Sequence, residues 1–403
     1  MSPSRRAALA AGLVLCAALA SPAWAQVRAP GKPPMANTAE AGLWDLSHRA
    51  EVQARARADL NRDPALNAWV SQMTCQIAGE HCADIRVSVM DRPVFNAMVM
   101  PNGFVEVWSG LMLRATTADE LAFVLGHEVG HFLEEHSFER LRREKITQNV
   151  MLAVSLGAAA AGAYYQVDVS DLIDAVYLTG VSAHFAYSRA HESQSDQMGL
   201  DRVAALGLNP GAGRLIWENQ LAETAASSFS RVRRAEAFGS AFRTHPLTAE
   251  RVSALRAQGE RLGVREVQVE DRRQYRAMIR PHLGHWIEDE HRHRDYGRLL
   301  HLLDRLGQDG EDLGLIFYHR GEVHRRRREA GDDLLAVAAY RVSVEHDDAP
   351  VEAWRELGTI EARLGNTAAA RDAFSQYLNK APTADDHWII EDQLAQLERK
   401  TDA

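Results

Sequence analysis

The chain has 403 residues, of which 46% are hydrophobic and 25% charged, with a formal net charge of −9. This apolar content is enough for packed cores, so wholesale disorder is excluded, and the length is typical of two or three domains. Because 46 basic residues face 55 acidic ones, the overall basic character of nucleic-acid-binding proteins is missing, and we expect no nucleic-acid partner. Three cysteines exclude a small disulfide-dense scaffold.

Residues 1–25 have the pattern of a secretory signal peptide. Arg5 and Arg6 form the positive start, an apolar run follows, and Ala-Trp-Ala at residues 23–25 fits a cleavage site. Cleavage removes two arginines, which takes the formal charge from −9 to −11. An uncleaved anchor is the alternative, although the apolar run is short for a membrane span. We expect an exported protein, with the periplasm as its compartment.

The segment after the signal predicts a flexible leader at residues 26–44 and then a mixed domain at residues 45–262. Helical patterning covers about 40–80, and three strand-like segments follow at 85–89, 94–99 and 103–108. The last two are separated by the turn sequence Met-Pro-Asn-Gly.

A helix is expected to begin near Thr117. Thr117 and Glu120, three residues apart, match a capping box, and an apolar run follows at once. Cys75 and Cys82 are the cysteines outside the signal peptide. They pair across a short loop if the compartment is oxidising, or they remain two partly buried thiols, and the sequence leaves both interpretations open.

A second apolar stretch lies at residues 150–165. It is too short for a full span, so we expect a buried helix or a segment in peripheral contact with a membrane. Helical patterning continues over 170–206, where Gly207 gives a stop signal, and again over 211–262.

The C-terminal part predicts a helical connector at 263–310 and tetratricopeptide-like repeats at 311–403. Six residues have the spacing of one such repeat: Trp354, Leu357, Gly358, Ala370, Phe374 and Pro382. Val323, Ala336 and Tyr340 lie one 34-residue period before three of them.

Seven histidines are scattered among arginines in this part: His282, His285, His291, His293, His301, His319 and His324. We expect a solvated charged face, with an accessory metal site as the alternative. The basic run at 325–328 is expected to be a helix face, with a contact to anionic lipid or a partner as the alternative.

The strongest motif is His127-Glu128-Val129-Gly130-His131. Two histidines at i and i+4 on a helix point in nearly the same direction, so both imidazoles reach one Zn²⁺. Three protein ligands leave a fourth position for water. Glu128 lies next to the first ligand, where it can take a proton from that water and pass it to a leaving amine.

The third ligand is expected from the segment at 188–199. Glu192 and Asp196 are again i and i+4, so Glu192 can complete the metal site while Asp196 accepts the spare ring N–H of a ligating histidine. His191 is a weaker rival for Glu192 because it points about 100° away along the helix. We expect His136, which lies beyond the ligand face, to be a surface residue.

Together these motifs resemble peptidase family M48, zinc metallopeptidases that share HExxH followed by ExxxD on a later helix. The segment from Asn96 to Phe104 is similar to the family's strand and turn before the active helix, and His245-Pro246 with Arg251 resembles its HPxxxxR segment. The resemblance implies that His245 and Arg251 lie near the metal, where they stabilise the oxyanion, or that His245 plugs the zinc in a latent enzyme.

The combination of signal peptide, M48-like domain and repeats resembles the periplasmic β-barrel assembly-enhancing protease group. That resemblance implies quality control of misfolded or misassembled outer-membrane proteins, with the repeats docking on the barrel-assembly machinery.

We therefore predict a mainly α fold, formed by a zincin-like domain with a small β-sheet and followed by helical repeats. One Zn²⁺ per chain is held by His127, His131 and Glu192, and the chain is a zinc endopeptidase. Its substrate adds as an extended strand along Asn96, Ala97, Met98 and Val99, using main-chain hydrogen bonds.

Two alternatives remain open. The chain is a chaperone or scaffold that binds clients through its repeats and keeps a latent zinc site, or it is a zinc hydrolase of non-peptide amides.

Overall fold

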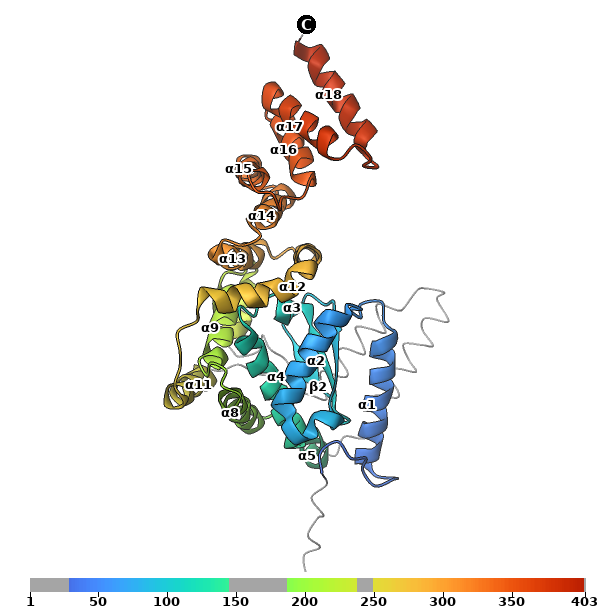
Figure 1. Cartoon of the computed structure of the whole chain (residues 1–403), viewed down its shortest axis with the longest axis vertical. Helices are drawn as coiled ribbons and strands as arrows, with labels where there is room; N and C mark the ends of the chain where they lie inside the picture. Colours follow the sequence, from blue (N-terminus) through green and yellow to red (C-terminus); the bar gives the residue numbers. More distant parts are fainter. Residues whose placement is uncertain (1–28, 145–186, 238–248, 402–403) are drawn as a thin grey trace, which may run out of the picture.

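The computed structural model describes residues 29–144, 187–237 and 249–401, and every structural statement below concerns these residues. They form a mainly helical body with a small sheet, and an arm of helices that extends from one end of the body (Figure 1). The first elements, in chain order, are α1 (Ala39–Ala56), α2 (Pro64–Ala78), η1 (Gly79–Asp84), β1 (Arg86–Met90), β2 (Ala97–Val99), β3 (Phe104–Trp108) and α3 (Ser109–Met112). The rest of the body comprises α4 (Ala118–Leu133), α5 (His136–Glu144), α8 (Arg189–Ala205), α9 (Ala212–Ala225), α10 (Ser230–Ala237), α11 (Ala249–Leu262), α12 (Val269–Glu290), η2 (His291–His293), α13 (Tyr296–Leu306) and η3 (Gly307–Asp309).

The predicted sheet of three strands is confirmed. Its order is β1-β3-β2, with β3 parallel to β1 and antiparallel to β2. Strand β2 is shorter than the predicted segment at 94–99 and is an edge strand of this sheet. The turn before β3 needs a glycine: Gly103 has φ +80°, and a Cβ there would lie 2.0 Å from the carbonyl oxygen of Asp84.

Helix α4 starts where the sequence predicts. The Thr117 hydroxyl accepts a hydrogen bond from the Glu120 N–H at 3.2 Å, which satisfies one of the free N–H groups of the first turn. The Glu120 carboxylate accepts from Thr116 instead of from the N–H of Thr117, so only half of the predicted capping box forms.

Helices α4 and α8 approach each other at glycines. A Cβ on Gly126 would lie 3.0 Å from the Cα of Gly199, and a Cβ on Gly199 would lie 2.8 Å from the N of His127. The two backbones are therefore so close that neither glycine leaves room for a side chain. This close approach brings the HExxH motif of α4 next to Glu192 and Asp196 of α8.

One hydrophobic core connects most of the body. It contains the sheet, α4, α8 and α9, and it continues through α12 and α13 to Val323 in the arm. The core thus crosses the predicted boundary at 262/263, and the domain boundaries remain predictions. Cys75 and Cys82 form a disulfide that joins the end of α2 to η1. Within the described residues, none of the helices is long and apolar enough to cross a membrane.

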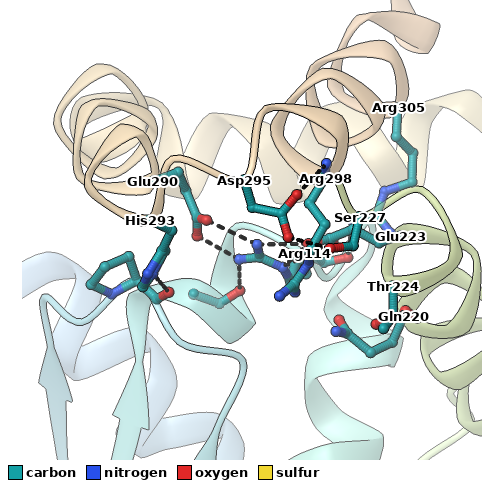
Figure 2. Close-up of polar contacts among 12 residues, drawn as sticks. Arg114, Gln220, Glu223, Thr224, Ser227, Glu290, His293, Asp295, Arg298 and Arg305 are labelled. Carbon is teal, nitrogen blue, oxygen red and sulfur yellow. Dashed lines mark hydrogen bonds and ion pairs between the residues drawn. The ribbon is translucent and has the colours of Figure 1, made fainter. Parts of the chain in front are cut away.

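A buried ion cluster fastens α12 and α13 to the rest of the body (Figure 2). The Arg114 guanidinium lies between two carboxylates, 2.7 Å from Glu223 on α9 and 2.6 Å from Glu290 on α12. Arg298 on α13 makes a second contact with Glu223 at 2.9 Å. Burial alone would raise the pKa of Glu223, but the two guanidinium groups outweigh this and hold it below its usual value.

The arm consists of two pairs of helices and a final helix. They are α14 (Leu313–Arg327), α15 (Asp332–Val344), α16 (Glu352–Arg363), α17 (Thr367–Lys380) and α18 (His387–Thr401). A Cβ on Gly358 would collide with Phe374, and one on Gly321 would collide with Tyr340, so each pair packs a glycine against an aromatic ring. The two glycines are 37 residues apart, three more than the predicted period, whereas the aromatic residues Tyr340 and Phe374 are 34 apart.

The histidines of this part are less exposed than predicted. His291, His319 and His324 are buried, so the expectation of a solvated face is wrong for these three, because α14 packs against η2 and α15. Burial, followed by the nearby Arg326, lowers the pKa of His291 to about 4. Burial and the neighbouring His291 lower that of His319 to about 3.

The basic run at 325–328 is largely neutralised within the chain. Arg325 and Arg326 both contact Glu322, Arg325 also contacts Glu356, and Arg327 contacts Asp332 at 2.6 Å. These ion pairs agree with the expected helix face.

Candidate metal centre

Helix α4 carries His127, Glu128 and His131 to the middle of the body, where all three are buried. The Nε2 atoms of the two histidines are 3.0 Å apart, and their ring planes are inclined by 75°. Two imidazole nitrogens therefore converge on one point beside the helix, as the i and i+4 spacing predicts.

Glu192 on α8 completes the group. Its carboxylate oxygens lie 3.5 Å from the Nε2 of His127 and 3.5 Å from that of His131. Zinc–ligand distances of about 2.0–2.1 Å in a tetrahedron require ligand atoms about 3.3 Å apart. The three side chains thus fit one zinc ion and leave the fourth corner of the tetrahedron to another ligand.

Asp196 and Arg251 surround these ligands. The Asp196 Oδ1 lies 2.9 Å from the Nδ1 of His127, the ring nitrogen that faces away from the metal position. Arg251, on α11, contacts Asp196 at 2.7 and 2.8 Å and the Glu192 carboxylate at 2.7 Å. Burial opposes the charge on Asp196, but hydrogen bonds from Arg251 and His127 outweigh it and lower its pKa. The arginine therefore holds both acids in place, and on Glu192 it contacts Oε2, the oxygen that also lies 3.5 Å from the Nε2 of His127.

Glu128 contacts the edge strand. Its carboxylate Oε2 accepts a hydrogen bond from the N–H of Val99 in β2 at 3.1 Å. In antiparallel pairing, backbone groups alternate between the partner strand and the outer edge. Because Asn96 and Met100 bond to β3, the backbone groups of Ala97 and Val99 point to the outer edge of the sheet, toward Glu128.

The surroundings of His131 differ from the sequence prediction. Tyr187 stacks on its ring at a centroid distance of 3.7 Å, and His136 meets its Nδ1, with 2.9 Å between the two Nδ1 atoms and 71° between the ring planes. His136 is only 1% exposed, so its prediction as a surface residue is wrong. Helix α4 ends at Leu133, and Glu135 takes a left-handed backbone with φ +53°, which folds His136 back under the site.

Several predicted residues lie outside the described part of the chain. His245 is one of them, so its roles as oxyanion donor or plug stay predictions, as does the buried or membrane-proximal segment at 150–165. The oxyanion role of Arg251 is likewise a prediction, since its observed contacts are to Glu192 and Asp196.

Two other groups of metal-ligand side chains occur among the described residues. One combines His136 and His191 with Glu139, but the two rings are stacked at 4.2 Å with 15° between their planes, so their in-plane lone pairs run parallel and do not converge. The other combines His291 and His319 with Glu288, whose carboxylate is bound by Arg326 at 2.9 and 3.0 Å.

Buried histidines and a glutamate that fit one zinc ion, with a second glutamate beside them, are the side-chain set of a zincin-type metallopeptidase site. Comparison with known families agrees: the model for peptidase family M48 matches residues 61–258. The chain therefore contains a peptidase family M48 domain, of a family that uses zinc.

Three relatives share part of this domain. The mitochondrial metalloendopeptidase OMA1 of Arabidopsis thaliana is 30% identical over 33% of this chain. The metalloprotease LoiP of Escherichia coli is 28% identical over 40%. A Vibrio cholerae protein named "Putative beta-barrel assembly-enhancing protease" is 27% identical over 37%. The matches span 25%, 57% and 32% of those relatives, respectively.

Two features of the site escaped the sequence reasoning. The burial of His136 was missed because its position was predicted from a helix that continues past Leu133. On such a helix His136 would point away from the side that carries His127 and His131. The sequence does contain a signal for the end of this helix. The apolar pattern of α4 stops at the two charged residues Glu134-Glu135. The second missed feature is the close approach of α4 and α8. Gly126 and Gly199 indicated it, since a glycine inside a helix usually has a packing reason.

Proposed function

We propose that this chain is an exported zinc-dependent endopeptidase that cleaves misfolded or misassembled envelope proteins, including those of the outer membrane. The observation that carries the proposal is the convergence of His127, His131 and Glu192, from two separate helices, on one metal-sized position beside Glu128.

The chemistry follows from the residues around that position. A bound zinc ion acts as a Lewis acid that polarises the scissile carbonyl and makes water more acidic. Glu128 takes a proton from the attacking water and returns it to the leaving amine. Asp196 keeps the Nδ1–H of His127 hydrogen-bonded, which directs the Nε2 lone pair of that ring toward the metal position.

Substrate recognition is assigned to the edge of β2, along Asn96, Ala97, Met98 and Val99. The outward backbone groups of Ala97 and Val99 offer hydrogen bonds to an extended peptide, whatever its side chains are. The N–H of Val99 donates to the Glu128 carboxylate, so the proton-transfer group and the peptide-binding edge are in direct contact. Sequence-tolerant binding of this kind suits unfolded segments.

Two observations bear on the compartment and the partner. The signal-peptide pattern and the name of the Vibrio cholerae relative favour the periplasm and a role near barrel assembly. The arm, which extends away from the body, is the candidate for docking on the barrel-assembly machinery (Figure 1).

The direct test is Glu128→Gln in the purified chain with casein as an unfolded substrate. We expect zinc content to be unchanged and turnover to fall by about 10²–10⁴-fold, because the proton-transfer group is lost. Wild-type activity should also disappear with 1,10-phenanthroline and return with zinc. Turnover that survives in Glu128→Gln would contradict the assignment.

A second candidate is client binding without cleavage. It is favoured by exposed apolar side chains on the arm, where Trp388 is 68% exposed and Leu334 is 65% exposed. The same assay separates the two: retention of unfolded casein without cleavage, in the wild type and in His245→Ala, would favour a scaffold with a latent site.

A further inference from the structure

The two histidine ligands of the metal centre are supported in different ways. His127 has a charged acceptor behind it, the carboxylate of Asp196 at 2.9 Å, which Arg251 neutralises in turn. His131 has another imidazole behind it, with 2.9 Å between its Nδ1 and the Nδ1 of His136. Both distances are those of hydrogen bonds, and His136 is buried as deeply as the ligands themselves.

A hydrogen bond between two ring nitrogens needs one donor and one acceptor, so it fixes where the protons are. The Nε2 of His131 faces His127 and Glu192, so in the metal-bound state it carries no proton. The proton of His131 must then be on Nδ1, and the Nδ1 of His136 must accept it.

The hydrogen bonds beyond His136 agree with His131 as the donor and His136 as the acceptor. With its Nδ1 accepting, His136 carries its own proton on Nε2, which lies 3.2 Å from the side-chain oxygen Oε1 of Gln194. The Gln194 amide in turn donates to the Glu134 carboxylate at 2.6 Å. Every donor therefore has an acceptor, from the ligand to the surface. The Ser195 hydroxyl also approaches the Nδ1 of His136, but at 3.4 Å it is a longer, weaker contact than His131.

We propose that His136 is a positioning residue for the metal centre, which accepts the Nδ1–H of His131 and so holds that ring with its Nε2 lone pair toward the metal. The inference rests on the proposed function, since it assumes that His127, His131 and Glu192 bind zinc. Support of this kind is worth about 10–100-fold in metal affinity where it has been removed from other zinc sites.

The chain offers substitutions that separate this role from simple space-filling. In His136→Asn the side-chain oxygen can occupy the place of Nδ1 and accept from His131. In His136→Gln the longer side chain moves its amide group toward the place of Nε2, near Gln194, and leaves His131 without its acceptor. His136→Ala removes both contacts. His191→Ala is the matched control, because His191 is buried and stacks on His136, while its own Nε2 lies 3.2 Å from the carboxylate of Glu139.

Zinc affinity of the purified chain, measured by competition with a chelator, is the primary readout. We expect a loss of about 10–100-fold for His136→Ala and for His136→Gln. His136→Asn should remain within about threefold of the wild type, since its acceptor is kept. His191→Ala should resemble the wild type. A slowly exchanging imidazole N–H resonance of His131 in the zinc-loaded protein should be present in the wild type and His136→Asn, and absent in His136→Gln.

Equal affinities for Asn and Gln at position 136 would overturn the inference, and this comparison stands even if His136→Ala does not fold. The outcome is distinct from failure of the proposed function. A wild-type chain that binds no zinc would refute both, whereas zinc lost in His127→Ala but kept in His136→Gln would refute only the role of His136.

Discussion

The body contains two buried clusters of charged and polar groups that look alike in composition and differ in what they can bind. Around Arg114, donors and acceptors are matched: its guanidinium and that of Arg298 face the carboxylates of Glu223 and Glu290 (Figure 2). At the metal centre, two imidazole nitrogens and a carboxylate point at one another, and all of them are lone-pair donors.

The comparison shows which property makes a buried polar cluster a binding site. Matched charges satisfy each other and fasten helices together, whereas converging lone pairs are satisfied only by a cation. The metal centre also contains an arginine, but in the contacts described above Arg251 meets only the acids Glu192 and Asp196, and within the described residues no such cation lies between the two imidazole nitrogens that face each other. The first cluster should therefore serve stability and the second metal binding.

The largest expected effect comes from Arg114→Met. The variant leaves Glu223 and Glu290 buried with less compensation, which typically costs about 3–5 kcal/mol. Urea unfolding should show this loss of stability, while the zinc affinity of the folded protein is unchanged. A variant that unfolds normally but loses zinc would contradict the separation of the two clusters.

An intermediate effect is expected from pH. Burial lowers the pKa of His291 to about 4, below its unfolded value of about 6.5, so the unfolded chain binds more protons in this range. Stability is complete above about pH 6.5 and falls as the pH drops toward 4, by about 2 kcal/mol at pH 5.

The lowered pKa of Glu223 matters only at lower pH. The stability that the Glu223 carboxylate contributes is fully present above its usual pKa of 4.5 and is lost as the pH falls through its lower pKa in the folded protein. Hydrogen exchange at pH 7 and pH 5 should therefore show that the contact between η2 and α14 loosens before α9 does. The reverse order, or an unchanged pattern in His291→Gln, would contradict this assignment.

The smallest effect is expected from Gly199→Ala. The added Cβ would lie 2.8 Å from the N of His127, so α8 must shift away from α4 at a cost of about 1–3 kcal/mol. Because Glu192 is on α8, zinc affinity should fall together with stability. Gly284→Ala on α12 is a control with room for the methyl group, whose nearest neighbour would be 3.5 Å away. Equal behaviour of the two variants would count against close helix packing as the cause.

Much of the fold and the ligand set follows from local sequence rules. The three strands, the Thr117 cap, the HExxH pair and the i, i+4 pair of Glu192 and Asp196 each depend on spacing along one element, which the sequence displays directly. Features that depend on where chain direction changes were missed or misjudged. His136 is buried because Glu135 turns the chain, and the histidines at 291, 319 and 324 are buried because helices pack on them.

The Arg114 cluster could not have been predicted from spacing at all. Its partners are 109 and 176 residues away along the chain, and nothing near any of them marks the pairing. The metal centre was predictable because two of its ligands must lie about one helical turn apart, which gives a recognisable spacing in the sequence. An ion pair requires no particular spacing between its two residues.

The most direct test is X-ray absorption at the zinc edge, combined with metal analysis, on the purified wild-type chain and on Glu192→Gln. We predict one zinc per wild-type chain, bound by two imidazoles and one carboxylate, with the carboxylate signal and most of the zinc lost in the variant. An unchanged zinc content and ligand shell in Glu192→Gln would show that the helix α8 carboxylate is not a ligand and would contradict the metallopeptidase centre described above.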